Sequence, residues 1–164
     1  MNMAGHDQLS DKFPIVYDEK SGLPIWKDLR ELKLRYSLPI STIRKFFGGL
    51  SEGVLYGTSC KKCGEKFFPP KPRCPKCGSR DVEWVEVDRE GKLLSYTVVN
   101  VKPESYQRYP DYVVGIAETD KGFRILAWVK CDDPDKLSRG MRVKIEIGKR
   151  EGEDTLLYYI VPEA

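Results

Sequence analysis

The sequence is poor in histidine and lacks the loops that bind phosphate in many enzymes. Its one histidine is His6, near the amino terminus. Ser-His-Asp and Cys-His catalysis and the common zinc hydrolase sites all need an imidazole held by the fold. No GxGxxG or Walker-type loop is present either. We therefore expect the chain not to be an enzyme.

Signals for membrane insertion or export are also missing. The opening residues MNMAGHDQ lack the basic segment and apolar run of a secretory signal. No apolar stretch approaches the roughly 18 residues that a membrane-spanning helix needs. Because the cysteines are expected to be reduced, the chain is predicted to be cytoplasmic.

Four of the five cysteines form a regular pattern. Cys60, Cys63, Cys74 and Cys77 make two CxxCG motifs, CKKCG and CPKCG. Structural zinc takes a closed tetrahedron of ligands, and two such knuckles supply two thiolates each. The pattern predicts a structural zinc ribbon over residues 54–80. A segment this short buries little apolar area, so the metal would supply much of its folding free energy.

Two other interpretations of the cysteines stay open. A rubredoxin-like iron site uses the same four ligands, and two disulfides are a further alternative. A thioredoxin-type site is disfavoured, because its CxxC is single and precedes a helix. The fifth cysteine, Cys131, lies in the segment AWVKC and is predicted to be a small, half-buried apolar residue.

The amino-terminal third is predicted to hold a flexible tail and two helices. Residues 1–24 are polar and interrupted by proline and glycine, which favours a tail. Residues 25–36 carry apolar side chains at three- and four-residue spacing, which predicts a helix that begins after Pro24. A second helix is expected from an N-cap at Ser41 to the glycines 48, 49 and 53, so the helical region is 25–53. Its apolar face either packs on the same chain or docks on a partner.

Residues 81–164 read as a series of strands. The segments VEWVEV, KLLSYTVVNV, DYVVGIAET, FRILAWVK, MRVKIEI and TLLYYIV are separated by turn signals such as Asp120-Lys121-Gly122. One short helical turn, DDPDKL, falls between the third and fourth barrel strands. The pattern favours a five-stranded OB-fold barrel, with a β-sandwich as the alternative. The predicted fold class is mainly β, with amino-terminal helices, a rubredoxin-like ribbon and an OB barrel.

Positive charge is concentrated on the ribbon. Residues 60–80 hold seven Lys or Arg and one acid, whereas residues 81–164 hold 13 basic and 17 acidic residues. The cations either offset the charge of a zinc tetrathiolate or bind phosphates. Aromatic residues that would stack on nucleic acid lie in the acidic barrel, which weakens that interpretation.

The order of these parts resembles a known family. The segment GTSCKKCGEKFFPPKPRCPKCGS followed by the strand REGKLLSYTVV is similar to zinc-ribbon and OB-fold accessory proteins of acyl-CoA metabolism, long labelled a domain of unknown function. The resemblance covers roughly residues 40–164. It implies acyl-CoA binding and a thiolase or hydroxymethylglutaryl-CoA synthase-like enzyme as partner. Lys71 departs from the arginine expected after the double proline, and lysine lacks bidentate phosphate geometry.

The resemblance suggests where coenzyme A would bind. Its phosphorylated head needs cations, and its pantetheine arm needs a narrow apolar channel. The candidates to bind the phosphates are Lys66, Lys71 and Arg73. The candidates to line the channel are Tyr96, Tyr109 and Trp128.

The leading hypothesis is a non-catalytic accessory protein that binds acyl-CoA or holds it for a thiolase-type partner. The first alternative is a module that binds single-stranded nucleic acid. The second is a small redox or transfer enzyme that uses Cys131.

Overall fold

The computed structural model describes residues 14–27, 37 and 39–163, which belong to two compact units, Met1–Leu38 and Pro39–Ala164. In the first unit, β1 (Ile15–Tyr17) pairs antiparallel with β2 (Pro24–Trp26). The turn between them is closed by the Asp18 side chain, which accepts a hydrogen bond from the Ser21 N–H at 2.8 Å, and by Gly22 at φ 68°.

This hairpin corrects two predictions. The expected tail of residues 1–24 contains a strand at Ile15–Tyr17, and the expected helix start at Ile25 lies in a strand. The physical reason is local, because an Asp side chain and a left-handed glycine form a tight turn that aligns the flanking segments as strands. The rest of that predicted helix, residues 28–36, lies outside the described residues.

The second predicted helix is present but shorter and differently bounded. A 3₁₀ turn, η1 (Ser41–Ile43), leads into α1 (Arg44–Ser51), and Ser41 makes no side-chain cap. Gly48 and Gly49 lie inside the helix rather than at its end. A β-carbon at Gly49 would lie 2.5 Å from the Tyr56 ring, so only glycine allows this close approach to the ribbon.

The helix buries one face against its own chain. Phe46 and Leu50 are buried, and the Phe46 ring lies 5.7 Å from that of Phe68 and 6.4 Å from that of Tyr158. Phe47 is 43% exposed on the other side. Most of the predicted apolar face therefore packs within the molecule.

The ribbon is a three-stranded antiparallel sheet in the order β4-β3-β5. Its strands are β3 (Tyr56–Cys60), β4 (Lys66–Phe67) and β5 (Val82–Glu86). Strand β5 is the segment VEWVEV, which the sequence assigned to the barrel. It pairs with β3 along its full length instead. The predicted boundary at residue 81 is therefore wrong, because alternation shows that a segment is a strand but not which sheet it joins.

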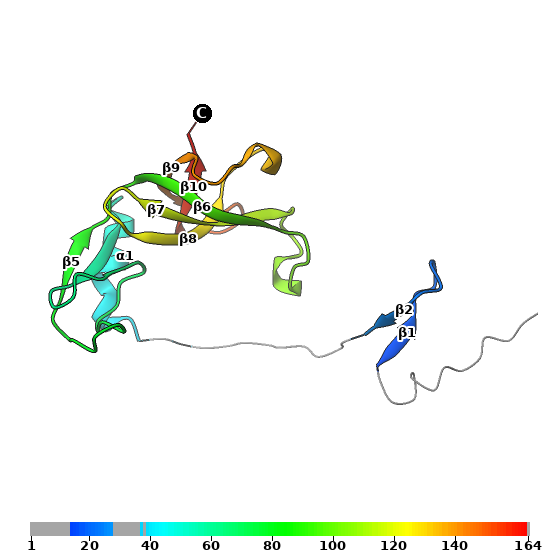
Figure 1. Ribbon diagram of the computed structural model, residues 1–164, viewed down its shortest axis with the longest axis horizontal. Helices are drawn as coiled ribbons and strands as arrows, with labels where there is room; N and C mark the ends of the chain where they lie inside the picture. The colour runs from blue at the N-terminus through cyan, green and yellow to red at the C-terminus, as the bar shows by residue number, and fades with distance from the viewer. Residues whose placement is uncertain (1–13, 28–36, 38, 164) are drawn as a thin grey trace, which may run out of the picture. The chain divides into compact units, whose positions relative to one another are not determined.

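The remaining strands close a five-stranded barrel in the order β10-β8-β7-β6-β9 (Figure 1). The strands are β6 (Glu90–Val99), β7 (Tyr112–Thr119), β8 (Arg124–Val129), β9 (Arg142–Lys149) and β10 (Leu156–Pro162). Short 3₁₀ turns are η2 (Glu104–Tyr106) and η3 (Pro134–Lys136). The OB-type barrel, the helical turn between β8 and β9 and the β7–β8 hairpin are confirmed, and the sandwich is excluded.

Ribbon and barrel are joined without a flexible linker. Only residues 87–89 separate β5 from β6. The Val87 N–H donates to the Leu55 carbonyl at 2.8 Å. The Asp88 carboxylate accepts from the Lys121 N–H at 2.8 Å, and the Arg89 guanidinium donates to the Gly53 carbonyl. All three residues of the connection are therefore bonded to neighbouring segments.

The barrel core is filled by inward-facing apolar side chains, as alternation along the strands requires. Fully buried members include Leu93, Ala117, Phe123, Ile125, Val143 and Ile160. Among the helices within the described ranges, none has the length and apolarity required to cross a bilayer.

Candidate functional site

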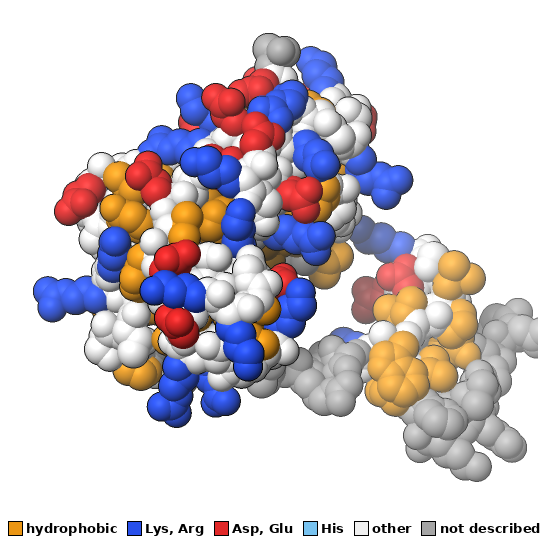
Figure 2. Space-filling view, turned by 60° about the vertical axis from the view of Figure 1, so that its left-hand side comes forward, with side chains coloured by type: hydrophobic (Ala, Val, Ile, Leu, Met, Phe, Trp, Pro, Cys, Tyr) orange, Lys and Arg blue, Asp and Glu red, His pale blue; other side chains and the backbone are white. Residues whose placement is uncertain are grey.

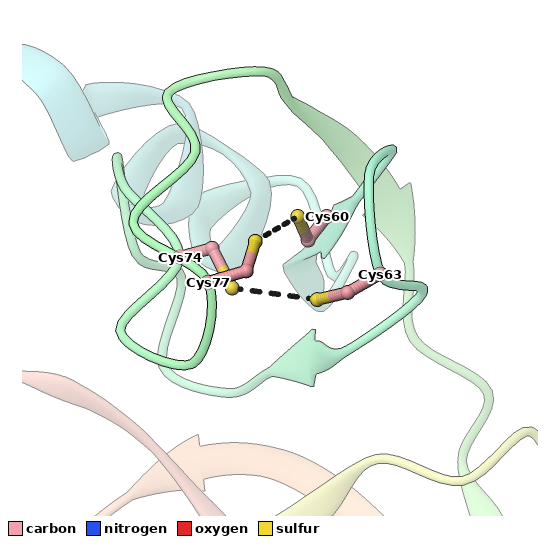
Figure 3. A group of neighbouring side chains, drawn as sticks. All are labelled: Cys60, Cys63, Cys74 and Cys77. Atoms are coloured by element: carbon pink, nitrogen blue, oxygen red, sulfur yellow. Dashed lines mark hydrogen bonds between the residues drawn. The ribbon is translucent and has the colours of Figure 1, made fainter.

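The four predicted ligands converge on one point at the tip of the ribbon (Figure 3). The sulfurs of Cys60 and Cys77 lie 3.6 Å apart, as do those of Cys63 and Cys74, and all four lie within 4.8 Å of one another. Sulfurs on a tetrahedron around zinc, with bonds near 2.3 Å, are about 3.8 Å apart. The separations are far longer than a disulfide bond of about 2.05 Å. The residues fit a structural zinc ion, and the disulfide alternative is wrong.

Each knuckle is built by the same local structure. The Gly64 N–H donates to the Cys60 carbonyl at 2.8 Å, and the Gly78 N–H donates to the Cys74 carbonyl at 2.9 Å. Both glycines have φ of 72°. This left-handed conformation is strained for other residues. The CxxCG sequence therefore determines the geometry of the cage.

The two cysteines of the first knuckle differ in how readily they ionise. The Glu65 N–H lowers the pKa of Cys63, but burial and the other three thiols raise it to about 12. Cys60 is the member of this knuckle that favours the thiolate. Burial of Cys60 opposes ionisation, but the backbone N–H groups of Cys63 and Lys62 and the neighbouring thiols lower the pKa of Cys60 to about 7. Four thiolates leave no position for a water or substrate, so this centre is architectural.

Of the three residues predicted to bind phosphate, two have side chains that are hydrogen-bonded to backbone carbonyls of the same chain. The Lys66 ammonium donates to the Lys121 carbonyl, and the Arg73 Nε donates to the Gly78 carbonyl at 2.9 Å. Lys71 is placed differently, because its backbone N–H bonds the Thr58 hydroxyl at 2.9 Å. This contact fixes Lys71 at the rim of a pocket of about 250 Å³. The pocket is lined by Thr42, Ile43, Thr58, Pro70, Lys71, Pro72, Val82 and Trp84.

The predicted channel aromatics lie in two different places. The Tyr96 hydroxyl donates to the Leu137 carbonyl at 2.7 Å. Tyr109 and Trp128 contact each other, with ring centroids 5.6 Å apart. The six predicted ligand residues therefore do not share one set of contacts in the described structure.

Tyr109 and Trp128 belong to a larger aromatic cluster on the outer face of the barrel. Tyr112 stacks on Trp128 at 4.0 Å, and Tyr106 lies 6.1 Å from Trp128. The guanidinium of Arg150 lies 4.1 Å above the Trp128 ring. Several ring faces are thus covered by neighbours within the cluster.

Sequence reasoning missed Arg150 and Glu153, which hold this cluster together. The Glu153 carboxylate accepts from the Tyr109 hydroxyl, from Arg108 at 2.9 Å and from Arg150 at 3.3 Å. The Tyr109 hydrogen bond, with smaller effects of Arg150 and Arg108, lowers the pKa of Glu153. Both residues lie in the charged segment REGED, where no local signal separates them from solvated neighbours.

Cys131 follows β8 and is half-buried, as predicted. Burial raises the pKa of its thiol, and the negative charges of Asp132 and Asp133 raise it further. A thiol of this kind is a poor nucleophile near neutral pH. The structure therefore gives no support to an enzyme that uses Cys131.

Two family models match adjacent parts of the chain. Residues 47–83 match the model described as "ChsH2, rubredoxin-like zinc ribbon domain". Residues 84–148 match the model described as "ChsH2, C-terminal OB-fold domain". Together they cover the ribbon and most of the barrel.

Similar curated proteins include scaffold proteins and enzyme subunits. A "DUF35 domain-containing scaffold protein" of Methanocaldococcus jannaschii is 32% identical over 108 residues, which is 64% of this chain and 77% of that protein. The "Benzoylsuccinyl-CoA thiolase subunit BbsA" of Thauera aromatica is 33% identical over 52% of this chain and 63% of its own length. A "Probable enoyl-CoA hydratase alpha subunit" of Thermomonospora curvata is 35% identical, but only 30% of its length is covered.

Solved structures show the same architecture. The "Ltp2-ChsH2(DUF35) aldolase" matches with a TM-score of 0.63 and 27% identity, over 78% of this chain and 98% of that one. A DUF35-family protein from Sulfolobus solfataricus, at 20% identity and a TM-score of 0.51, supports the fold alone.

Proposed function

Because the chain belongs to the DUF35 family of zinc-ribbon and OB-fold proteins, we propose that it is a non-catalytic subunit that holds acyl-CoA for a thiolase-type enzyme complex. Relatives of this family are named as scaffold proteins and as a thiolase subunit. These names support an accessory role.

The closed metal centre is the observation that carries the non-catalytic part of the proposal. Among the described residues, the one cluster of metal-ligating side chains is the four-cysteine cage, which leaves no open coordination position. The single histidine of the sequence, His6, lies outside those residues. Catalysis would then come from the partner, a thiolase or hydroxymethylglutaryl-CoA synthase-like enzyme.

The ribbon side offers apolar side chains for that partner. Ile40 and Phe47 are 46% and 43% exposed near α1, while Phe46 and Leu50 are used inside the molecule. Contiguous exposed apolar surface marks interaction sites, and we propose that these two side chains form part of such a surface.

The Lys71 pocket is the best candidate for the head of coenzyme A. Trp84 lines it and offers a flat apolar surface for adenine, while Lys71 offers a charge for phosphate. Residues 60–80 hold seven Lys or Arg and one acid, and Figure 2, in which the ribbon side is turned toward the viewer, shows Lys and Arg side chains spread over that face. Of the six ligand residues predicted from the sequence, Lys71 is therefore the one we place in this site.

The test combines co-purification with calorimetry. The chain is co-expressed with a thiolase-type enzyme, and acetyl-CoA is titrated into the complex and into each component. We expect a stable complex and binding heat, with affinity about tenfold weaker for Lys71→Ala because a charge-assisted contact is lost. Lys149→Ala, which removes a barrel lysine paired with Asp154, is the control.

The possible results separate the parts of the proposal. Failure of the two proteins to elute together would reject the partner assignment. A complex without binding heat would reject acyl-CoA binding and leave the scaffold role. Equal affinity of the Lys71→Ala and Lys149→Ala variants for acetyl-CoA would show that the ligand does not bind at Lys71.

The nucleic-acid alternative is disfavoured by the packing of the aromatic cluster. Tyr112 and Arg150 cover the Trp128 ring, whereas a single-strand reader presents free ring faces in a basic groove. We expect no binding of a labelled oligothymidylate. Binding that weakens linearly on a log-log plot against salt would favour the alternative.

A further inference from the structure

One strand of the barrel has an edge that is only partly paired. Strand β8 pairs with β7 from Arg124 to Val129, but its pairing with β10 is limited to Trp128 and Val129. Figure 1 shows β8 at the lower border of the barrel, below β7. Within residues 39–163, no strand is in register with the opposite side of β8 at 124–127.

The direction of the backbone groups follows from the hydrogen bonds at the paired end. The Lys130 N–H donates to the Ile160 carbonyl at 2.8 Å, so the backbone groups of Lys130 point toward β10. In a strand, alternate residues direct their N–H and C=O groups to the same side. The backbone groups of Leu126 and Arg124 therefore point away from β7 and toward the unpaired edge.

A pocket lies beside this edge. It has a volume of about 190 Å³ and is lined by Leu126, Ala127, Trp128, Arg150, Leu157, Tyr158 and Tyr159. Leu126 itself is 62% exposed. Ile116, which pairs with Leu126 from the neighbouring strand β7, is 37% exposed. An unpaired edge with exposed apolar side chains is a ready template for another strand.

The polar atoms in the pocket wall are already used inside the molecule. The Tyr159 hydroxyl and the Arg150 Nε are both buried, and the Arg150 side chain hydrogen-bonds Tyr159. The wall that an incoming group would meet is therefore formed mainly by apolar side chains, among them Leu126, Trp128 and Leu157.

We propose that the β8 edge and its pocket bind an extended segment of a partner protein, which adds a short strand to the barrel. The edge presents both N–H and C=O groups at strand spacing, and only a polypeptide backbone matches both. The pocket would take one apolar side chain of the segment. Arg124 and Arg150 are already paired with Glu118 and Glu153. Lys130, whose ammonium lies 4.2 Å from the centre of the Tyr159 ring, is therefore the cation that favours an acidic residue next to that side chain.

The test uses a phage-displayed library of random ten-residue peptides, selected on the full-length zinc-loaded protein. We expect enriched peptides with alternating apolar residues and an acidic neighbour. A synthetic consensus peptide is then measured against Leu126→Pro and Leu126→Ala. Proline removes the edge N–H while the β7 ladder stays intact, so we expect binding about tenfold weaker for Leu126→Pro than for Leu126→Ala.

Controls keep the result interpretable. Zinc content and thermal unfolding confirm that both variants fold. Hydrogen exchange on the wild-type protein gives a second measurement, with the Leu126 amide protected only when the peptide is present. No enriched peptide, equal binding by the two variants or an unprotected amide would overturn the proposal. Self-association of the free chain through this edge, detected by ultracentrifugation and abolished by Leu126→Pro, would also overturn it.

Discussion

The ring of Phe123, from the barrel, packs directly on the bare α-carbon of Gly57 in the ribbon. A β-carbon at position 57 would lie 2.6 Å from the Phe123 ring and 2.8 Å from the Phe67 carbonyl oxygen. Phe123 is fully buried. The ribbon and the barrel therefore share one core, and glycine is required where they meet.

Gly57→Ala is expected to destabilise the whole unit, because the added methyl group collides with backbone as well as with the ring. A cost of about 1–3 kcal/mol is typical of overpacking. Gly48→Ala is the control, since nothing lies within 4 Å of its β-carbon and alanine favours a helix. Thermal unfolding should show a lower Tm for the first variant and an equal or higher Tm for the second. A single transition in both would confirm the shared core.

Cys74→Ser is expected to lose the metal and unfold the ribbon, because metal binding supplies folding free energy on the order of 10 kcal/mol in such small sites. Elemental analysis should find one zinc per wild-type chain and far less in the variant. Cys131→Ser, outside the cage, should retain the metal. One iron per wild-type chain instead of zinc would show that the site is the rubredoxin-like iron centre.

Glu153→Gln is expected to lower stability at neutral pH and to lose that effect in acid. The Tyr109 hydrogen bond lowers the pKa of Glu153 below its usual 4.5, so the ionised form stabilises the fold above that pH. This contribution disappears as the pH falls through the lowered pKa. The Tm difference from wild type should therefore shrink below about pH 4. Glu151→Gln, in the same loop, should show no such trend.

Cys131 is expected to react slowly with iodoacetamide at pH 8 in the zinc-loaded protein. Burial and the charges of Asp132 and Asp133 raise the pKa of its thiol above 9.0, and the thiolate is the reactive form. Mass spectrometry should show faster alkylation as the pH rises above that value. Asp132→Asn should speed the reaction and Asp154→Asn should not. Rapid labelling at pH 7 would revive the redox hypothesis.

The sequence predicts the metal centre in full but the barrel surface only in part. The four cysteines are found from spacing alone, because each knuckle is a local structure closed by its own glycine. The strand at Val82–Glu86 is visible by alternation, yet its pairing with Tyr56–Cys60 depends on contacts distant in sequence. The same limit hides Arg150, which follows β9 in the sequence and contacts the Trp128 ring of β8 only through the fold of the barrel.

The bonded connection at residues 87–89 fixes how the ribbon is joined to the barrel within residues 39–163. Val87, Asp88 and Arg89 are each hydrogen-bonded to a neighbouring segment, which restricts movement of the ribbon tip relative to the outer face of the barrel. An assembly built on both surfaces would have its spacing set by this chain. Lengthening the connection by even a few residues would change that spacing while leaving each surface intact.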